Sequence, residues 1–215
     1  MKSLKLFENH SAYEAAKESL VLPNVSFCVR QNEVHYNKRI DPYNGHEYVD
    51  LGLPNGTKWA TMNIGATSET DYGNYYQYGK GSAQYTATSG DSYYDGTEKP
   101  LSLSADTAAQ VWGGSWHMPT YDQLNELTAN TTSEWTTIDG VNGYKFTSTN
   151  GNYIFFPAAG RWNDDVQTDI ATKGFYWGSY PASTANGYDL EFYDGRMRIS
   201  YIYRGFGLPV RGVVD

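Results

Sequence analysis

The sequence predicts an α+β domain that is built mostly from antiparallel strands and the turns between them. Its 215 residues include 20 Tyr and 22 Gly, and these residue types favour strands and turns respectively. Few stretches repeat apolar residues with the period of a helix. The dipeptides Asn150-Gly151 and Asp194-Gly195 each join two strand-like segments. Such dipeptides are the strongest local signal of a two-residue β-hairpin turn.

Residues 1–45 are predicted to form a small attachment segment, separate from the main domain at residues 46–215. Ser11–Leu20 has the pattern of a short helix, and the strand-like segments 25–29 and 33–37 are expected to pair as a hairpin. A segment of this length builds a poor core on its own. We therefore expect it to pack on the main domain or on a second copy of the chain, which would make the protein a homo-oligomer.

The first half of the main domain contains two strand candidates, a long irregular region and one clear helix start. Residues 47–53 and 57–65 are the strand candidates, and residues 66–104 show no period and predict a long loop region. Thr120 begins the best helix. Thr120 and Gln123 have the spacing of a capping box, in which each side chain accepts a hydrogen bond from the other residue's backbone N–H.

The second half of the main domain is predicted to consist of strands that complete one sheet. The run Tyr153–Pro157 is apolar enough to be a central strand that is buried on both faces. Residues 161–172 are expected to form a loop. The expected strands are residues 134–138, 143–149, 152–160 and 174–180, the two arms of the terminal hairpin, and a closing strand at 210–214.

The hairpin around Asp194-Gly195 is the most informative part of the chain. A two-residue loop there opposes Tyr193 to Arg196, Phe192 to Met197, Glu191 to Arg198, Leu190 to Ile199 and Asp189 to Ser200. Because side chains alternate along a strand, one face then carries Leu190, Phe192, Met197 and Ile199, which suit a core. The other face carries Asp189, Glu191, Tyr193, Arg196, Arg198 and Ser200. Tyr and Arg are enriched at binding hot spots, so this face is predicted to be a binding surface.

Six motifs follow one another along the main domain: GLPNGTKWATMNIGA, WGGSWHMPTYDQLNEL, NGYKFTS, IFFPAAG, FYWGSY and GLPVRGV. Together, over residues 47–213, they resemble the Fibrobacter succinogenes major paralogous domain, a family abundant in proteins of gut Bacteroidetes. That family is similar to the C-type-lectin-like domains of formylglycine-generating-enzyme type, which include the variable proteins of diversity-generating retroelements. The resemblance implies a C-type-lectin-like fold with twisted antiparallel sheets, two helices and long loops.

The resemblance also implies where a ligand binds. In the retroelement variable proteins, the C-terminal segment displays exposed, hypervariable residues that contact the ligand. The matching positions here are Phe175, Tyr180, Asp189, Glu191, Tyr193, Arg196, Arg198, Ser200, Tyr201, Tyr203 and Phe206. The implied partner is a cell-surface protein or a glycan receptor. The segment LPNVSFCVRQNEVHYN resembles the start of tail-associated proteins of gut Bacteroides phages, so we expect the chain on a phage tail or on a bacterial cell surface.

Composition and motifs disfavour several other classes of function. The formal net charge is -8, whereas nucleic-acid-binding proteins usually carry a basic patch. No apolar run approaches the roughly 20 residues that span a bilayer, and the first residues lack the pattern of a secretory signal. No phosphate-binding loop, dinucleotide fingerprint or nucleophile elbow occurs, and no cofactor is implied. Formylglycine-generating enzymes need active-site cysteines, whereas Cys28 in the attachment segment is the single cysteine, so we expect no enzymatic activity.

Two alternative interpretations stay open. The chain could be a structural module whose exposed aromatic residues contact another subunit of a tail or appendage. It could also be a calcium-dependent sugar lectin, because Trp162-Asn163-Asp164 matches a short lectin motif, and Asp165 and Asp169 add oxygen ligands. The partner lectin motif is missing and the histidines lack metal spacing, so no metal site is predicted. Trp162 is expected to be exposed, and most of Trp59, Trp112, Trp116, Trp135 and Trp177 to pack in the core.

Overall fold

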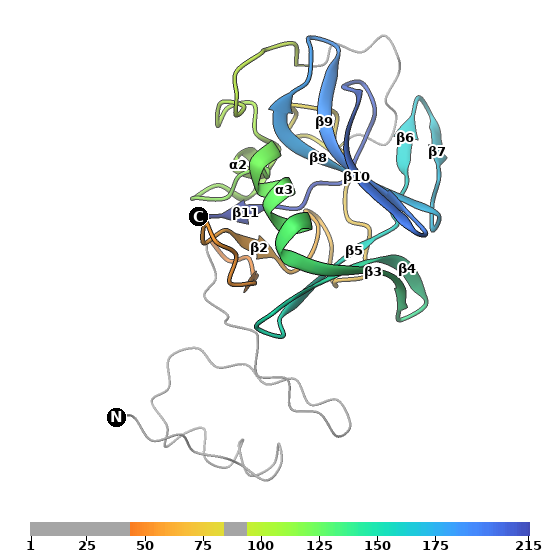
Figure 1. Cartoon of the computed structure of the whole chain (residues 1–215). Coiled ribbons are helices and arrows are strands. Elements are labelled where there is room, and N and C mark those ends of the chain that lie inside the picture. The colour runs from red at the N-terminus through yellow and green to blue at the C-terminus, as the bar shows by residue number, and fades with distance from the viewer. Residues whose placement is uncertain (1–43, 84–93) are drawn as a thin grey trace, which may run out of the picture.

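The computed structural model describes residues 44–83 and 94–215 (Figure 1). The helix predicted at Ser11–Leu20 and the hairpin predicted at residues 25–29 and 33–37 lie outside these ranges. The described part contains two helices and several small antiparallel sheets, so the α+β class is confirmed. The prediction of one large sheet was wrong, because the strands are divided among separate sheets of two or three strands.

The two ends of the main domain meet in one small sheet. Its strand order is β1 (Tyr48–Asp50), β2 (Lys58–Ala60) and β11 (Val213–Val214). Both predicted N-terminal strands are therefore present, although each is short. The closing strand pairs with β2 rather than with the terminal hairpin. This pairing brings the last residues of the chain beside the start of the domain (Figure 1).

A second sheet contains β3 (Thr131–Ile138), β4 (Val141–Ser148) and β5 (Tyr153–Pro157) in that order. The hairpin predicted at Asn150-Gly151 joins β4 to β5, and Gly151 has a positive φ of 85°. β5 is buried as predicted, but it is an edge strand and not a central one. Arg211 contacts β5, since its guanidinium donates to the Phe155 carbonyl at 2.8 Å.

The third sheet holds the terminal hairpin and has the strand order β10, β9, β8. The strands are β8 (Lys173–Pro181), β9 (Asn186–Tyr193) and β10 (Arg196–Tyr203). The predicted register is confirmed at all five pairs from Tyr193–Arg196 to Asp189–Ser200. The loop predicted at residues 161–172 is instead largely a short hairpin of β6 (Arg161–Asn163) and β7 (Val166–Thr168).

The two helices begin at side-chain caps. α3 (Tyr121–Asn130) has the predicted capping box, with the Thr120 hydroxyl and the Gln123 amide each accepting from the other residue's backbone. α2 (Thr107–Trp112) was not predicted from the pattern of residues, because six residues are too few to show a helical period. The buried Asp106 carboxylate caps this helix through the Ala109 N–H.

Two apolar clusters form the core. The α3 cluster includes Trp59, Leu124, Leu127, Phe146, Phe156, Tyr176, Leu190 and Phe192. The α2 cluster includes Tyr76, Tyr78, Trp112, Trp116, Phe175, Trp177 and Val210. Four of the five tryptophans predicted in the core are buried, and Trp135 packs at the edge of the α3 cluster. The sheet of β8, β9 and β10 contributes residues to both clusters, so it has a core on each side.

Arg211, from the predicted closing segment, is fully buried and links parts of the chain that are far apart in sequence. Its guanidinium donates to the Asn63 side-chain oxygen at 2.9 Å, to the Ala60 carbonyl at 3.0 Å and to the Phe155 carbonyl. It also lies 4.6 Å from the centre of the Phe156 ring. Burial lowers the pKa of Arg211 to about 10, which leaves the guanidinium charged at neutral pH.

Asn63 extends this network to the sheet of the terminal hairpin. Its amide nitrogen donates to the Tyr176 hydroxyl at 3.2 Å, and that hydroxyl donates to the Pro157 carbonyl at 2.7 Å. Tyr176 belongs to β8 and Pro157 to β5. With Arg211 bound to Ala60 of β2, one buried network therefore connects all three three-stranded sheets.

Replacing Arg211 by Met should lower the free energy of unfolding by about 3–5 kcal/mol, because it leaves several buried acceptors without a donor. Urea denaturation of the full chain measures this change. Arg196→Met is a matched control, since Arg196 is exposed and its replacement should change stability by less than about 0.5 kcal/mol. Similar effects of the two substitutions would contradict the structural role given to the Arg211 network.

Candidate functional site

The sheet of β8, β9 and β10 has one apolar and one polar face, as the alternation predicted. Tyr176, Leu190 and Phe192 are buried on the apolar face, and Met197 and Ile199 pack against the same α3 cluster. The opposite side is called the polar face below. It carries Lys173, Phe175 and Trp177 from β8, Asp189, Glu191 and Tyr193 from β9, and Arg196, Arg198 and Ser200 from β10.

The exposed end of the polar face lies beside the Asp194-Gly195 turn. Arg198 pairs with Glu191 across the two strands, with its Nη2 and Nε at 2.6 Å and 2.8 Å from Oε2. The side chain of Arg198 is 51% exposed and that of Glu191 is 13% exposed, so the pair presents its guanidinium to solvent. The exposed Arg196 donates to the Tyr193 hydroxyl at 3.2 Å. Both contacts join residues that the sequence predicted to be opposite one another.

A second charged group adjoins this end of the polar face. The Asp169 carboxylate lies 3.2 Å from the Lys173 ammonium and 3.6 Å from the Arg161 guanidinium. Arg161 also stacks over two aromatic rings, at 4.8 Å from the centre of Phe175 and 5.1 Å from that of Phe206. The cations Arg161 and Lys173 therefore join Arg196 and Arg198 on one side of the molecule.

Sequence reasoning did not find Arg161 or Lys173 as site residues. Lys173 is opposite Tyr193 in the register, so extending the alternation into the neighbouring strand would have found it. No local pattern marks Arg161. It reaches the polar face from β6, which begins beside β8 through a parallel bridge between Gly160 and Gly174.

Two residues predicted to be exposed on the binding surface are buried. Asp189 is 1% exposed and Phe175 is 3% exposed, so the prediction of their exposure was wrong. Asp189 lies opposite Trp177 on β8, and Trp177 and Phe175 belong to the α2 cluster, against which Ile202 and Phe206 pack. The alternation of residues correctly gave the face of the sheet. It could not show that a second core covers the inner part of that face.

The Asp189 carboxyl is in an unfavourable place for a charge. Neither of its oxygens has a hydrogen-bond partner among the residues that the structure describes. Burial, together with the nearby Glu191 carboxylate, raises the pKa of Asp189 to about 8, although Arg198 and Arg161 oppose the shift. The carboxyl therefore holds a proton for most of the time at neutral pH.

The other predicted residues do not gather on the polar face. Tyr201 is opposite Tyr188, which places it on the apolar side of β10, where it is 65% exposed beyond the core. Tyr203 meets the ring of Phe206 edge-on at 5.6 Å, and Tyr180 is half-buried. The structure therefore brings together Glu191, Tyr193, Arg196, Arg198 and Ser200 on one face, and it separates Tyr201 from them.

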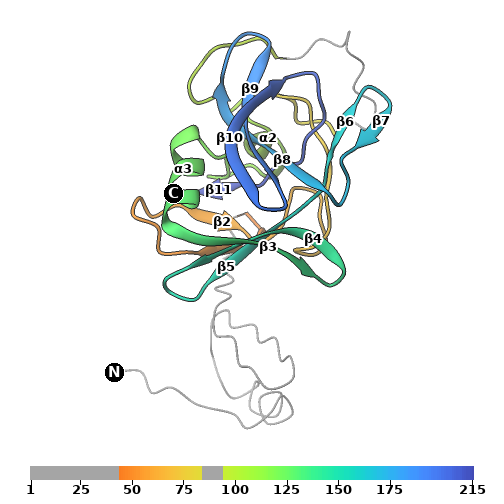
Figure 2. The same cartoon turned by 45° about the vertical axis from the view of Figure 1, so that its right-hand side comes forward.

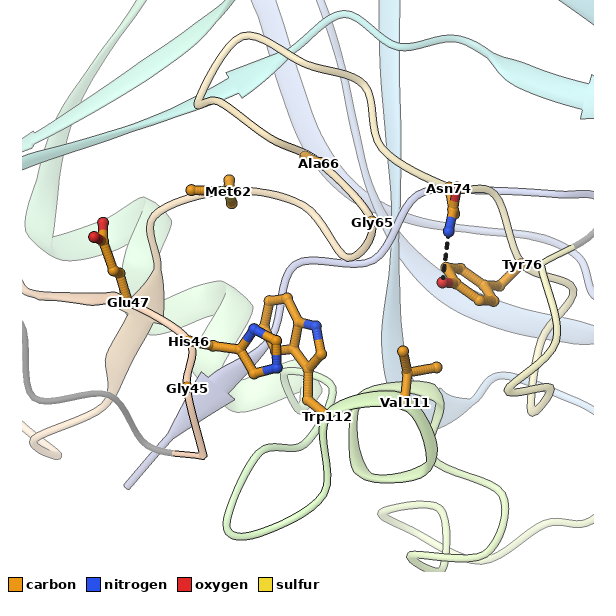
Figure 3. Close-up of a pocket in the computed structure, with 10 residues that line it drawn as sticks. All are labelled: Gly45, His46, Glu47, Met62, Gly65, Ala66, Asn74, Tyr76, Val111 and Trp112. Atoms are coloured by element: carbon orange, nitrogen blue, oxygen red, sulfur yellow. Dashed lines mark hydrogen bonds between the residues drawn. The ribbon is translucent and has the colours of Figure 1, made fainter.

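A pocket of about 530 Å³ lies elsewhere, where the described chain begins (Figure 3). The His46 imidazole stacks on the Trp112 indole with 4.2 Å between ring centres, and burial lowers the pKa of His46. Asn74 donates to the Tyr76 hydroxyl at 3.4 Å. The residues that line the pocket are Gly45, His46, Glu47, Met62, Gly65, Ala66, Asn74, Tyr76, Val111 and Trp112, so it shares no residue with the polar face.

Comparisons with protein-family models, with curated proteins and with solved structures find no match to this chain. Across residues 44–83 and 94–215, no three His, Cys, Asp or Glu side chains gather as they would around a metal ion. Neither helix in these ranges has the length and apolar character needed to cross a bilayer. Trp162 of the possible lectin motif is half-buried and not exposed, and Asp164 and Asp165 lie in the turn between β6 and β7.

The buried carboxyl predicts how stability depends on pH. The folded-state pKa of Asp189, about 8, is above the unfolded value near 3.9. The folded protein then binds a proton that the unfolded chain releases, so stability falls as pH rises between about 4 and 8. Asp189→Asn removes this dependence. Its advantage over the wild type should be small at pH 4 and approach roughly 5 kcal/mol at pH 8.

Urea unfolding of both proteins at several pH values measures this difference. The exposed Asp165 gives a matched control, because Asp165→Asn should leave the pH dependence unchanged. An advantage of Asp189→Asn that is the same at pH 4 and pH 8 would show that the carboxyl ionises normally in the folded protein.

Proposed function

We propose that this protein is a non-enzymatic binding protein, and that the exposed end of its polar face contacts the ligand. The observation that carries the proposal is the grouping of Tyr193, Arg196 and the Arg198–Glu191 pair on a sheet whose other face is packed in the core. Tyr offers a large and rigid contact area, and Arg offers directional hydrogen bonds. Since the strands beneath them are held by the core, the backbone loses little freedom on binding.

We further propose that the domain is a C-type-lectin-like variable protein of the kind that diversity-generating retroelements diversify. The order of the six sequence motifs supports this assignment, and the small antiparallel sheets with two helices agree with it at the level of fold class. Residues 1–45 would attach the domain to a larger assembly, such as a phage tail or a cell-surface appendage. The receptor that the domain binds would be a protein or a glycan on a cell surface.

The triple variant Tyr193→Ala, Arg196→Ala, Arg198→Ala should lose binding to receptor-bearing cells by at least roughly 100-fold, because one hot-spot residue contributes on the order of 2 kcal/mol and a 100-fold loss corresponds to about 2.7 kcal/mol. The measurement is the binding of the labelled full chain to a panel of gut Bacteroidetes cells, by flow cytometry. The melting temperature should stay within about 4 °C of the wild type, since the replaced side chains contribute little to the core.

A control removes a cationic and an aromatic side chain, both half-buried, from another sheet. Lys145 lies 4.9 Å from the centre of the Tyr153 ring on β4 and β5, and the double variant Lys145→Ala, Tyr153→Ala should bind cells as the wild type does. Equal binding by the triple variant and the wild type would reject the assignment of the polar face.

A further inference from the structure

The outer edge of β10 is open. β10 is the last strand of its sheet and pairs with β9 on one side only (Figure 2). No other described segment forms backbone hydrogen bonds with residues 196–202. Half of the backbone N–H and C=O groups of an edge strand point away from its partner, and they can pair with an additional strand. β10 is eight residues long, and its open part, residues 196–202, has the length of an ordinary strand.

The side chains along this edge differ between the two faces. Arg196 and Arg198 are exposed on the polar face, followed by the half-buried Ser200. On the apolar face, Met197 and Ile199 are only partly covered by the α3 cluster, and Tyr201 follows them and is 65% exposed. A strand added beside β10 would place its own side chains alternately next to these two sets.

The charge of the polar face favours an acidic partner. Lys173, Arg196 and Arg198 lie on it and Arg161 adjoins it, and the acids Asp169 and Glu191 pair with cations of this group. Asp189 adds little negative charge, because it is buried and its raised pKa keeps it mostly protonated. Asp194, which is exposed in the turn between β9 and β10, is a third acid near this end, so four cations face three acids there. The polar face is thus locally positive on a chain of net charge -8.

We propose that the ligand of this face is an extended acidic peptide segment of a partner protein, which adds to the open edge of β10 as a fourth strand. This inference rests on the proposed function and specifies its ligand. Alternate acidic side chains of the segment contact Arg196 and Arg198. The intervening apolar side chains cover Met197, Ile199 and Tyr201. Backbone pairing supplies affinity, and the alternation of the two kinds of side chain supplies specificity.

A second copy of the chain fits this edge less well. Pairing β10 with another β10 would place four arginines on one side of the joined sheet, where each copy has only Glu191 as a partner for Arg198. Like charges on neighbouring strands destabilise a sheet. An acidic peptide reverses the sign of this interaction, so it is the occupant that the edge favours.

The test measures how peptides of about eight residues bind the full chain, by fluorescence anisotropy at low salt, where the charge contribution is largest. In the first peptide Glu alternates with Val or Thr. In a second peptide of the same composition the Glu residues are adjacent in pairs, so they cannot all point to one face. A third peptide has the first sequence with N-methyl groups on alternate residues, which removes backbone donors without changing charge.

The first peptide should bind at least roughly tenfold more tightly than either of the others, because only it satisfies both the backbone edge and the arginines. Arg196→Glu should weaken its binding by roughly tenfold or more. Lys99→Glu makes the same change in net charge at an exposed residue outside the polar face, and it should leave binding within about twofold of the wild type.

Equal binding by the three peptides would overturn the edge-pairing proposal and leave only a charge interaction. Failure of the first peptide to bind would also overturn it, and the proposed function would then be judged separately by cell binding of the triple variant. If the full chain forms a dimer that Arg196→Glu changes and the peptide does not, the edge is occupied by a second copy and the proposal is wrong.

Discussion

The buried hydrogen-bond network of Arg211, Asn63 and Tyr176 is the interaction on which the rest of this structure depends. The sheet of β1, β2 and β11 is too small to be stable separately, since its strands have only two or three residues each. Arg211 donates hydrogen bonds to β2, to β5 and to the side chain of Asn63. Asn63 in turn donates to the hydroxyl of Tyr176 on β8. A buried cation without its acceptors would be very costly, so the network forms completely or the segments separate.

This network also fixes the base of the candidate site. Tyr176 lies on the apolar face of β8, directly behind the polar face, and it stacks on Phe192 of β9 at 5.8 Å. Gly174 permits this arrangement, because a Cβ atom there would lie 2.1 Å from the Phe192 ring. The close packing leaves the strands little freedom to shift, so the exposed Tyr and Arg side chains are presented in a defined geometry.

Asp189 shows how the two cores constrain the surface. The next pair on the same face, Glu191 and Arg198, is the ion pair that faces solvent, whereas Asp189 lies opposite Trp177 of the α2 cluster with no hydrogen-bond partner in the described part of the chain. Such a carboxyl costs stability where an apolar residue would not. A residue whose polarity does not suit its buried surroundings is typical of functional sites. Here that residue is Asp189, which lies directly beside the Glu191–Arg198 pair, where ligand contact is proposed.

The sequence by itself determined the local features of this protein. Asp194-Gly195 and Asn150-Gly151 defined two hairpins and the register of the terminal one, and Thr120 with Gln123 defined the start of α3. These features depend on neighbouring residues, so a single sequence contains the information. Only the tertiary structure decided how the strands divide into separate sheets, why β5 is buried at an edge, and why Asp189 and Phe175 are covered. It also brought Arg161 to the polar face. Those outcomes depend on contacts between segments far apart in the chain, and alternation shows which face a residue occupies but not what packs against that face.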